Sequence, residues 1–522
     1  MRDLNIGMFK AYDIRTKSEL LSQEMIRRLC EAVARYCDEV LEVRSIIVAH
    51  DARLAAPKLM EQALCTFASC GFEILANPLQ ISTCQFYFTC SCNPEAAGMM
   101  ITASHNPGNY IGLKLLAPRM QPIAMNCGPE GGLSKIKQFY IEGKTIPQNR
   151  RGQVHVINEA EHFVDYSMKL AGVGKDSLKG LSICMEFLSG TAGYDISMAM
   201  EKAGASPTYR HLVPDGNFPC GAPNPIIESS IAPEREFMRK HSFDFGFCYD
   251  GDGDRMDILD PEGKQIAPGF NMSLLMPYLL SLHHNAYLQG IFKDDPWRPC
   301  FYADVKAIPT ALVAIARSGI DVHIIRNGHS FIKAKLKENY RAQYLASEEE
   351  SAHYYMNFPL DPDDWHKGTV ATENTLFYTL LTSRAWLERP DDYKQTIALQ
   401  ESLFRKREWP LHFEAAPKKM ESIMNDVERA MGKRGALIIK QMDDGSDLDA
   451  VLMRFGLPRV FTADTRLSDT WCQVAQRISR SEDAMTRWEV VSNDDNLCEE
   501  MNGVIREIAD RYLSAGYARY DS

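Results

Sequence analysis

The chain has 522 residues, too many for one hydrophobic core, and should therefore divide into three or four domains. Its residues are 45% hydrophobic and 24% charged, as in globular proteins, and its net charge of −11 opposes a general surface for nucleic acid or anionic lipid. No leader segment and no apolar stretch long enough to span a bilayer is apparent, so we expect no membrane partner. Fourteen scattered cysteines without paired zinc spacing predict reduced thiols in a cytoplasmic protein.

Strand and helix patterns alternate along the first 150 residues. Apolar runs at residues 46–49 and 72–75 predict strands, and residues 57–70 predict a helix with proline in its first turn and Gly71 beyond its end. This alternation predicts a mostly parallel sheet that is covered by helices on both faces.

A further apolar run ends in the sequence Thr-Ala-Ser-His-Asn-Pro at residues 102–107. Pro107 keeps Asn106 extended, so Ser104 should lie in an open loop at the carboxyl end of a strand, where α/β sheets place ligands. A serine hydroxyl is a weak nucleophile without help from its neighbours, and for an isolated serine in a loop a turn stabilised by Ser and Asn is the more common explanation. A serine-hydrolase elbow is excluded because Thr102 and Asn106 stand where it needs glycines.

The strand and helix pattern restarts past Gly152 and leads to the sequence Asp-Gly-Asp-Gly-Asp-Arg at residues 250–255. Carboxylates at alternate positions, separated by glycine, can place their oxygens around one hard cation such as Mg²⁺. A calcium EF-hand is excluded, because Arg255 stands where it requires glycine and Pro261 where it requires glutamate.

The strand and helix pattern then begins for a third time, and a different C-terminal region follows. We expect a helix at 272–282, a strand at 301–305, a helix at 308–317 and a strand at 343–346. From about residue 384 a charged, helical linker should lead to a strand at 436–439, two or three more strands, and a last helix at 497–513.

Together, the two loops resemble the α-D-phosphohexomutase family, most closely its bacterial phosphomannomutases. The resemblance runs with gaps from Phe9 to about Asp510. It implies an α/β fold of three similar α/β sheet domains followed by an α+β C-terminal domain around a central cleft. The implied limits are 1–155 with a phosphoserine loop, 156–261 with a metal-binding loop, 262–384 with a sugar-binding loop and 385–522 with a phosphate-binding loop.

The resemblance implies that a phosphoryl group moves between O6 and O1 of a hexose, interconverting mannose 6-phosphate and mannose 1-phosphate through a phosphoserine and a hexose bisphosphate. It implies a Mg²⁺ cofactor held by Ser104, Asp250, Asp252 and Asp254, and a hexose 1,6-bisphosphate activator. Phosphoryl transfer requires that the charge of the transferred group is neutralised and that the attacking and leaving oxygens lie in line with it. The matched residues around the transferred group are Ser104, His105, Lys114, Arg15, Arg255 and His353, and both His105 and Lys114 are candidates for the general acid and base.

Other matched segments imply contacts with the hexose phosphate. They contain Tyr12, Lys306, Gly328, His329, Ser330, Glu349 and Ser351. Glu350 departs from the family pattern, which has an apolar residue there, and should add negative charge near an anionic ligand.

Two C-terminal stretches compete for the family's distal phosphate loop, whose pattern is Arg-x-Ser-Asn-Thr. Residues 466–470 match it better, but Asp469 would repel a phosphate. Residues 477–481 offer Arg477, Ser479, Arg480 and Ser481, and their two guanidiniums suit the ligand, so we favour Arg477 over Arg466.

Three alternatives remain open at this stage. The first is a phosphoglucomutase or a dual-specificity phosphohexomutase, although Gly253 and the Ser351-Ala352-His353 sequence favour the mannose branch over glucosamine phosphate mutases. The second is a non-catalytic sugar-phosphate-binding relative, which the intact Ser104 and aspartates oppose. The third is a calcium-binding structural protein, which Arg255 opposes. The sequence leaves the oligomeric state undetermined.

Overall fold

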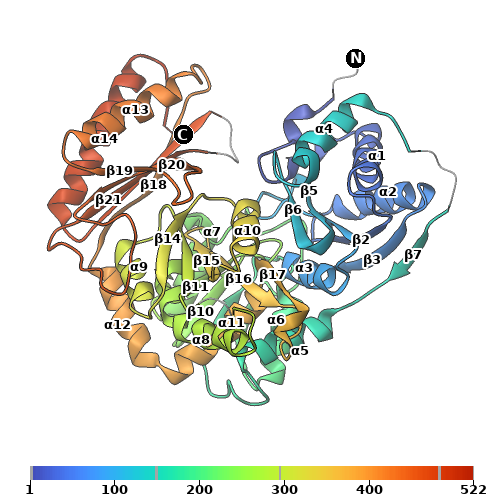
Figure 1. The fold of residues 1–522 in the computed structure, drawn as a ribbon, viewed down its shortest axis with the longest axis horizontal. Coiled ribbons are helices and arrows are strands. Elements are labelled where there is room, and N and C mark those ends of the chain that lie inside the picture. The colour runs from blue at the N-terminus through green and yellow to red at the C-terminus, as the bar shows by residue number, and fades with distance from the viewer. Residues whose placement is uncertain (1–3, 147–150, 293–295, 480–483, 521–522) are drawn as a thin grey trace.

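The computed structural model describes residues 4–146, 151–292, 296–479 and 484–520. Its strands form four sheets that follow one another along the chain, and we call each sheet with its covering helices a unit. The first unit (blue) and the fourth (orange to red) lie on opposite sides of the molecule, and the second and third lie between them (Figure 1). Multiple sheets across an α/β chain confirm the predicted fold class, while the predicted domain limits stay predictions.

The first unit holds seven strands in the order β1-β5-β4-β2-β3-β7, with β6 paired to β5. The strands are β1 Ile14–Lys17, β2 Ser45–His50, β3 Glu73–Gln80, β4 Ala97–Ile101, β5 Tyr110–Ala117, β6 Gln121–Ile123 and β7 Gln153–Val156. The helices are α1 Gln23–Glu39, α2 Ala56–Ser69, α3 Thr83–Cys92 and α4 Leu133–Glu142. β2 is parallel to β3 and β4, but β5 is antiparallel to β4 and β1. The sheet is therefore mixed rather than mostly parallel, because the short loop from β4 to β5 has no room for a crossover helix.

The second and third units have five strands each, ordered β12-β11-β10-β8-β9 and β14-β13-β15-β16-β17. The second contains α5 Ala160–Ala171, β8 Ile183–Glu186, α6 Gly193–Lys202, β9 Thr208–Arg210, α7 Glu228–Lys240, β10 Phe245–Tyr249, β11 Met256–Leu259 and β12 Gln265–Ile266. The third contains α8 Pro268–Leu288, β13 Cys300–Asp304, α9 Pro309–Ala316, β14 Asp321–Ile325, α10 His329–Glu338, β15 Tyr344–Glu349, β16 His353–Pro359, β17 Thr369–Glu373 and α11 Thr375–Glu388. Because β12 pairs with β11, the second sheet extends past residue 261, the predicted end of its domain.

The fourth unit is an antiparallel sheet in the order β18-β22-β21-β20-β19. It contains α12 Pro390–Glu401, β18 Phe404–His412, α13 Lys419–Gly432, β19 Leu437–Gln441, β20 Asp447–Phe455, β21 Cys472–Ile478, β22 Met485–Ser492 and α14 Asp495–Ser514. The prediction of a helical linker was wrong at β18. Four consecutive charged residues, 405–408, hide the strand pattern. The ion-pair partners of Arg405, Lys406 and Glu408 lie far away in the sequence.

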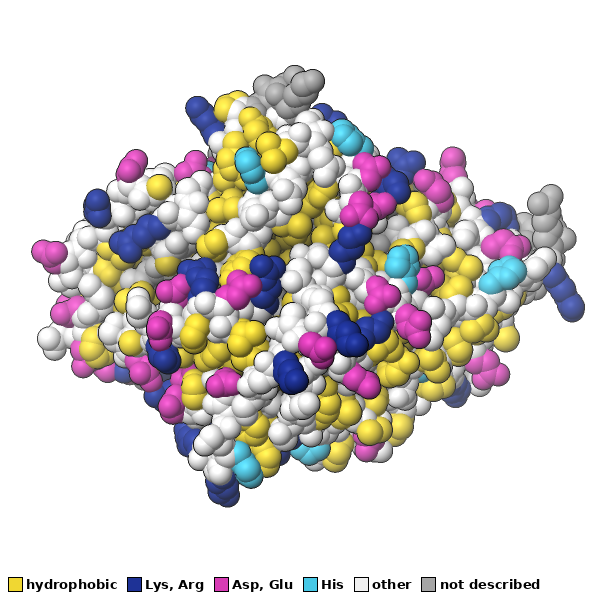
Figure 2. Space-filling view, turned by 90° about the horizontal axis from the view of Figure 1, so that it is seen from below, with side chains coloured by type: hydrophobic (Ala, Val, Ile, Leu, Met, Phe, Trp, Pro, Cys, Tyr) yellow, Lys and Arg dark blue, Asp and Glu magenta, His cyan; other side chains and the backbone are white. Residues whose placement is uncertain are grey.

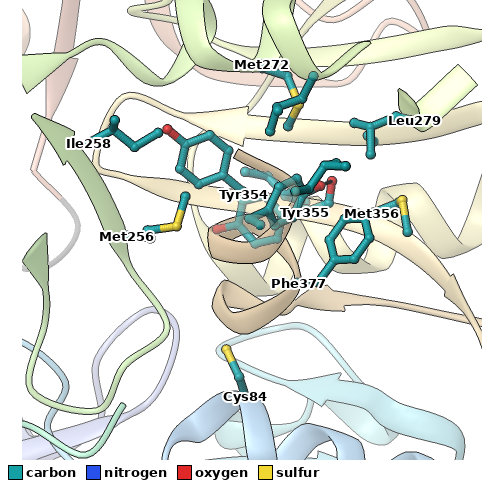
Figure 3. Close-up of a cluster of buried hydrophobic side chains, with 14 of the residues drawn as sticks. Cys84, Met256, Ile258, Met272, Leu279, Tyr354, Tyr355, Met356 and Phe377 are labelled. Atoms are coloured by element: carbon teal, nitrogen blue, oxygen red, sulfur yellow. Dashed lines mark hydrogen bonds between the residues drawn. The ribbon is translucent and has the colours of Figure 1, made fainter. Parts of the chain in front are cut away.

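Both faces of the fourth sheet are buried. Along β20, Val451 and Met453 face the core under α13 and α14, whereas Ala450 and Leu452 face a cluster shared with the other units. This alternation follows from the period of two along a strand. The shared cluster includes Met256, Tyr354, Tyr355 and Phe377 in the centre of the molecule (Figure 3). Since one cluster reaches all four sheets, packing fixes the units against one another.

The surface mixes both signs of charge. In Figure 2, Lys and Arg side chains lie among Asp and Glu side chains over the face that is shown, so the net negative charge is not gathered there into one patch. Each of the fourteen cysteines is a free thiol. Within the described residues, no helix combines the length and apolarity needed to cross a membrane.

Ion pairs join the fourth unit to the third. Glu350, in the turn between β15 and β16, lies 2.9 Å from Arg405 on β18, and Arg405 also lies 2.6 Å from Glu489 on β22. The Glu350 side chain is 2% exposed, so water screens this pair weakly. Lys335 pairs with Asp444 at 2.9 Å in the same interface.

We predict that Glu350→Gln lowers the free energy of unfolding by about 2 kcal/mol, because the buried carboxylate that accepts from Arg405 becomes a neutral amide and the charge assistance of this hydrogen bond is lost. Lys406→Gln is the matched control, since Lys406 on the same strand pairs with the exposed Glu499. It should lower the free energy by less than about 1 kcal/mol. Urea unfolding followed by tryptophan fluorescence measures both, and equal losses would contradict the importance of the Glu350 pair.

Candidate active site

The loop from β4 to β5, residues 102–109, holds Ser104 in a strained conformation. Ser104 is buried, and its φ of 49° lies in the left-handed region that residues other than glycine rarely adopt. Its amide donates to Thr102 Oγ1 at 2.9 Å. Its hydroxyl donates to Asp250 Oδ2 at 3.1 Å and lies 3.2 Å from Nδ1 of His105. Strain of this kind persists where surrounding contacts enforce it, often at functional positions.

Arg53 enforces this loop, and the sequence analysis missed it. The fully buried guanidinium donates to the backbone oxygens of Ser104 at 2.6 Å, Asn106 at 2.7 Å, Pro107 at 2.7 Å and Tyr110 at 2.9 Å. Asp51 balances its charge at 3.1 Å. One sequence signal could have indicated Arg53, because it comes just after the strand β2. Since β2 is parallel to β4, both strands end at the same edge of the sheet, where the Ser104 loop begins.

The acidic loop, residues 250–255, joins β10 to β11 and lies against the Ser104 loop. All three aspartates are buried. A Cβ at Gly251 would stand 2.8 Å from the backbone oxygen of Ser104, so only glycine allows this approach. The two loops that the sequence analysis singled out therefore lie in contact.

Lys114 on β5 compensates the negative charge of the acidic loop. Its Nζ lies 2.7 Å from Asp252 Oδ2 and 2.5 Å from Asp254 Oδ2. Burial opposes charge on Lys114, but the two carboxylates outweigh it and raise the pKa of its ammonium. Burial likewise acts against ionised Asp254, yet Lys114 lowers its pKa, whereas burial and the neighbouring carboxylates hold the pKa of Asp250 well above its usual range.

The acidic loop fits a divalent cation. Within the described part of the chain, Asp252 Oδ1 and Asp254 Oδ1 are buried without a hydrogen-bond partner. The three carboxylates offer ligand atoms within 4.8 Å of one another. Buried carboxylate oxygens without donors are suitable ligands for a hard cation.

Arginines and neutral imidazoles surround the serine. Arg15 donates to Asn106 Oδ1 at 2.8 Å, and Arg255 Nε donates to His353 Nε2 at 3.1 Å. Burial, with the nearby Arg255, holds the pKa of both His105 and His353 well below its usual range. Both rings are therefore neutral at physiological pH. His105 is available as a proton acceptor, whereas the lone pair of His353 Nε2 already accepts from Arg255.

Glu349 sits at the end of β15, near the loop before α10. Its carboxylate accepts from the amide of Gly328 at 3.0 Å and from the Tyr355 hydroxyl. Burial, followed by Asp304, raises the pKa of Glu349 to about 7. A Cβ at Gly328 would meet the ring of Tyr12 at 2.5 Å, so Tyr12 of the first unit reaches this loop of the third.

The remaining predicted contacts of the third unit lie around this loop. His329 and Ser330 begin α10, Lys306 follows β13, and Ser351 is half-buried in the turn after Glu349. Glu350 differs from the expectation that it adds negative charge near an anionic ligand. Its side chain pairs with Arg405 of the fourth unit, so its charge is compensated there.

Arg477, at the end of β21, faces the third unit. Its guanidinium binds both oxygens of Glu408, at 2.8 and 3.0 Å. Burial disfavours a charged Glu408, but Lys306 and Arg477 outweigh it and hold its pKa well below the usual range. Arg466 is exposed in the loop between β20 and β21, and Ser479 is buried beside β22. Arg480 and Ser481 lie outside the described residues.

Comparisons with known proteins agree with this geometry. The family models described as phosphoglucomutase/phosphomannomutase alpha/beta/alpha domain I and domain II match residues 7–126 and 161–263. A protein named "Phosphohexose mutases" from Xanthomonas campestris pv. campestris strain B100 is 28% identical over 353 residues, 67% of this chain and 73% of that protein. The phosphomannomutase of Escherichia coli K12 is 29% identical over 355 residues, 66% of this chain and 72% of its own.

The fold itself matches a solved structure along almost its whole length. A phosphoglucomutase/phosphomannomutase family protein from Burkholderia thailandensis superimposes with a TM-score of 0.75 at 17% identity, covering 99% of this chain and 100% of that one. The two matched family models coincide with the units that carry the Ser104 loop and the acidic loop. The two family models, the curated phosphomannomutases and the matching fold together support the assignment of this chain to the α-D-phosphohexomutase family of isomerases.

Proposed function

We propose that this chain is a phosphomannomutase that interconverts mannose 6-phosphate and mannose 1-phosphate. The observation that carries the proposal is the buried Ser104 hydroxyl, 3.1 Å from Asp250 and 3.2 Å from neutral His105. Curated relatives named phosphomannomutase support mannose as the sugar. A glucose-directed or dual-specificity phosphohexomutase is the alternative, because the two sugars differ only at one carbon.

In the proposed reaction, phosphorylated Ser104 donates its phosphoryl group to a hydroxyl of the hexose monophosphate. The bond from phosphorus to Ser104 Oγ breaks, a bond to the sugar oxygen forms, and the hydroxyl proton leaves to a base. The resulting hexose bisphosphate reorients within the site and returns its other phosphoryl group to Ser104 Oγ. A hexose 1,6-bisphosphate would therefore serve as the activator that first phosphorylates the serine.

The two acid–base candidates suit different roles. Lys114 is held as a cation between two carboxylates, so it neutralises charge and donates hydrogen bonds. His105 is neutral and close to Ser104 Oγ, so it accepts the proton when the serine is rephosphorylated. Arg15 and Arg255 add positive charge for the transferred group.

Asp250, Asp252 and Asp254, with an oxygen of phosphorylated Ser104, would hold Mg²⁺, which supplies neutralisation of the charge on the transferred phosphoryl group. Glu349 would accept hydrogen bonds from sugar hydroxyls, and Arg477 would bind the phosphate that is not transferred. Lys306 lies close enough to Glu408 and Arg477 to take part in that phosphate site.

We expect purified protein with Mg²⁺ and a hexose 1,6-bisphosphate to convert mannose 1-phosphate into the 6-phosphate faster than glucose 1-phosphate. Ser104→Ala should abolish both conversions and remain folded. Intact-mass analysis should find one phosphate on the wild type and none on the variant. Equal activity of Ser104→Ala and wild type would exclude the mechanism, and binding without any turnover would favour a non-catalytic relative.

Arg477→Ala should raise KM for the hexose phosphate about tenfold to a hundredfold, because charge-assisted hydrogen bonds to a phosphate are lost. Arg466→Ala is the control, since that side chain is exposed, and its KM should match the wild type. Steady-state kinetics of both variants decide between the stretches. The opposite ranking would move the distal phosphate site to residues 466–470.

The pKa of about 7 for Glu349 predicts a pH dependence of sugar binding. Above this value the carboxylate is ionised and accepts hydrogen bonds, and below it the proton removes part of that capacity. KM should therefore rise up to about tenfold between about pH 8 and about pH 6. Glu349→Gln should have a high KM at every pH. Its KM should change with pH only as far as the substrate phosphate itself titrates. The same pH profile in both proteins would contradict the role of Glu349.

A further inference from the structure

The helix α3 of the first unit begins directly against the acidic loop of the second. Thr83, its first residue, is fully buried. The backbone amide of Thr83 donates to the backbone oxygen of Asp252 at 2.8 Å, and its Oγ1 donates to Asp252 Oδ2 at 2.6 Å. One residue of the first unit therefore holds both the backbone and the side chain of a loop aspartate.

These contacts leave one carboxylate oxygen of Asp252 for another use. Oδ2 accepts from Thr83 Oγ1 and from Lys114 Nζ, at 2.6 and 2.7 Å. Within the described residues, Oδ1 of the same carboxylate is buried and has no donor. Two donors on one oxygen fix the rotation of the carboxylate and therefore the position of Oδ1. The three loop aspartates offer ligand atoms within 4.8 Å of one another.

The start of α3 is itself held in place. Ser82 caps the helix by accepting from the amide of Gln85 at 3.0 Å, and its hydroxyl donates to Asp195 of the second unit at 3.1 Å. The Cys84 thiol lies 3.5 Å from the backbone oxygen of Gly253. Figure 3 shows Cys84 directed from its helix toward the central cluster that contains Tyr355. The position of Thr83 is thus set by packing between units.

We propose that Thr83 is a positioning residue of the cation site, which aims Asp252 Oδ1 at a divalent cation. The affinity of the acidic loop for the cation then depends on the docking of α3 against that loop. The inference rests on the proposed function only for the existence of the cation site, and it does not depend on which sugar is isomerised.

The test is isothermal titration of the full-length protein with Mg²⁺ alone. Thr83→Val keeps the size of the side chain but removes the donor, and it should weaken Mg²⁺ binding about tenfold, as the loss of a group that orients a metal ligand commonly does. Thr83→Ser keeps the hydroxyl and should bind Mg²⁺ like the wild type. Thr89→Val is the control in the same helix, because the Thr89 hydroxyl donates within α3 to Gln85 at 2.9 Å.

Asp252 Oδ2 keeps Lys114 in Thr83→Val, so no buried carboxylate oxygen loses its last donor. If that variant still fails to fold, Thr83→Cys, with a weaker donor, should give intermediate affinity. Unchanged affinity in Thr83→Val, or the same loss in Thr83→Ser or Thr89→Val, would overturn the inference alone. A wild type without Mg²⁺ binding would overturn it together with the cation site. A wild type that binds Mg²⁺ but isomerises no hexose phosphate would overturn only the proposed function.

Discussion

Mutual repulsion of three buried aspartates in one short loop is the constraint on which the rest of the site depends. Two unit charges 4 Å apart repel by about 4 kcal/mol at an effective dielectric constant of about 20. Lys114, on a strand of a different sheet, lies within hydrogen-bonding distance of two of these carboxylates. The acidic loop can therefore keep its charge buried only while the first unit is docked on the second.

The first three units place their functional residues at equivalent points. In each, a strand parallel to its neighbour turns into an antiparallel strand, at β4 to β5, β10 to β11 and β15 to β16. The first turn carries Ser104, the second the three aspartates, and the third follows Glu349. Repetition of one topology therefore brings the proposed nucleophile, the proposed cation site and the proposed sugar-binding carboxylate to the turns at three sheet edges.

Where the fourth unit meets the third, ion pairs add to the hydrophobic packing. Glu408 binds Arg477 and lies near Lys306 of the third unit, while Glu350 of the third unit binds Arg405. Glu350, which departs from the family pattern, is therefore part of an interface, and Arg405 compensates its charge beside the proposed phosphate site. Because the arginine that would bind the distal phosphate is held by a carboxylate, it is oriented before any ligand arrives.

The sequence by itself determined the fold class and the two central loops. Strand and helix periods along residues 46–101 and in the two later restarts follow from local patterns, and the glycines between Asp250, Asp252 and Asp254 give the spacing that predicts a cation site. Local patterns failed where distant partners decide the structure. β18 has four consecutive charges that only its neighbours neutralise, and the role of Glu350 depends on Arg405, 55 positions further along. Arg53 and Thr83 carry no motif, since their importance comes from backbone oxygens and a carboxylate that folding brings to them. Tertiary structure alone decided these contacts, because hydrogen bonds and ion pairs act over a few ångströms in space and leave no fixed spacing along the chain.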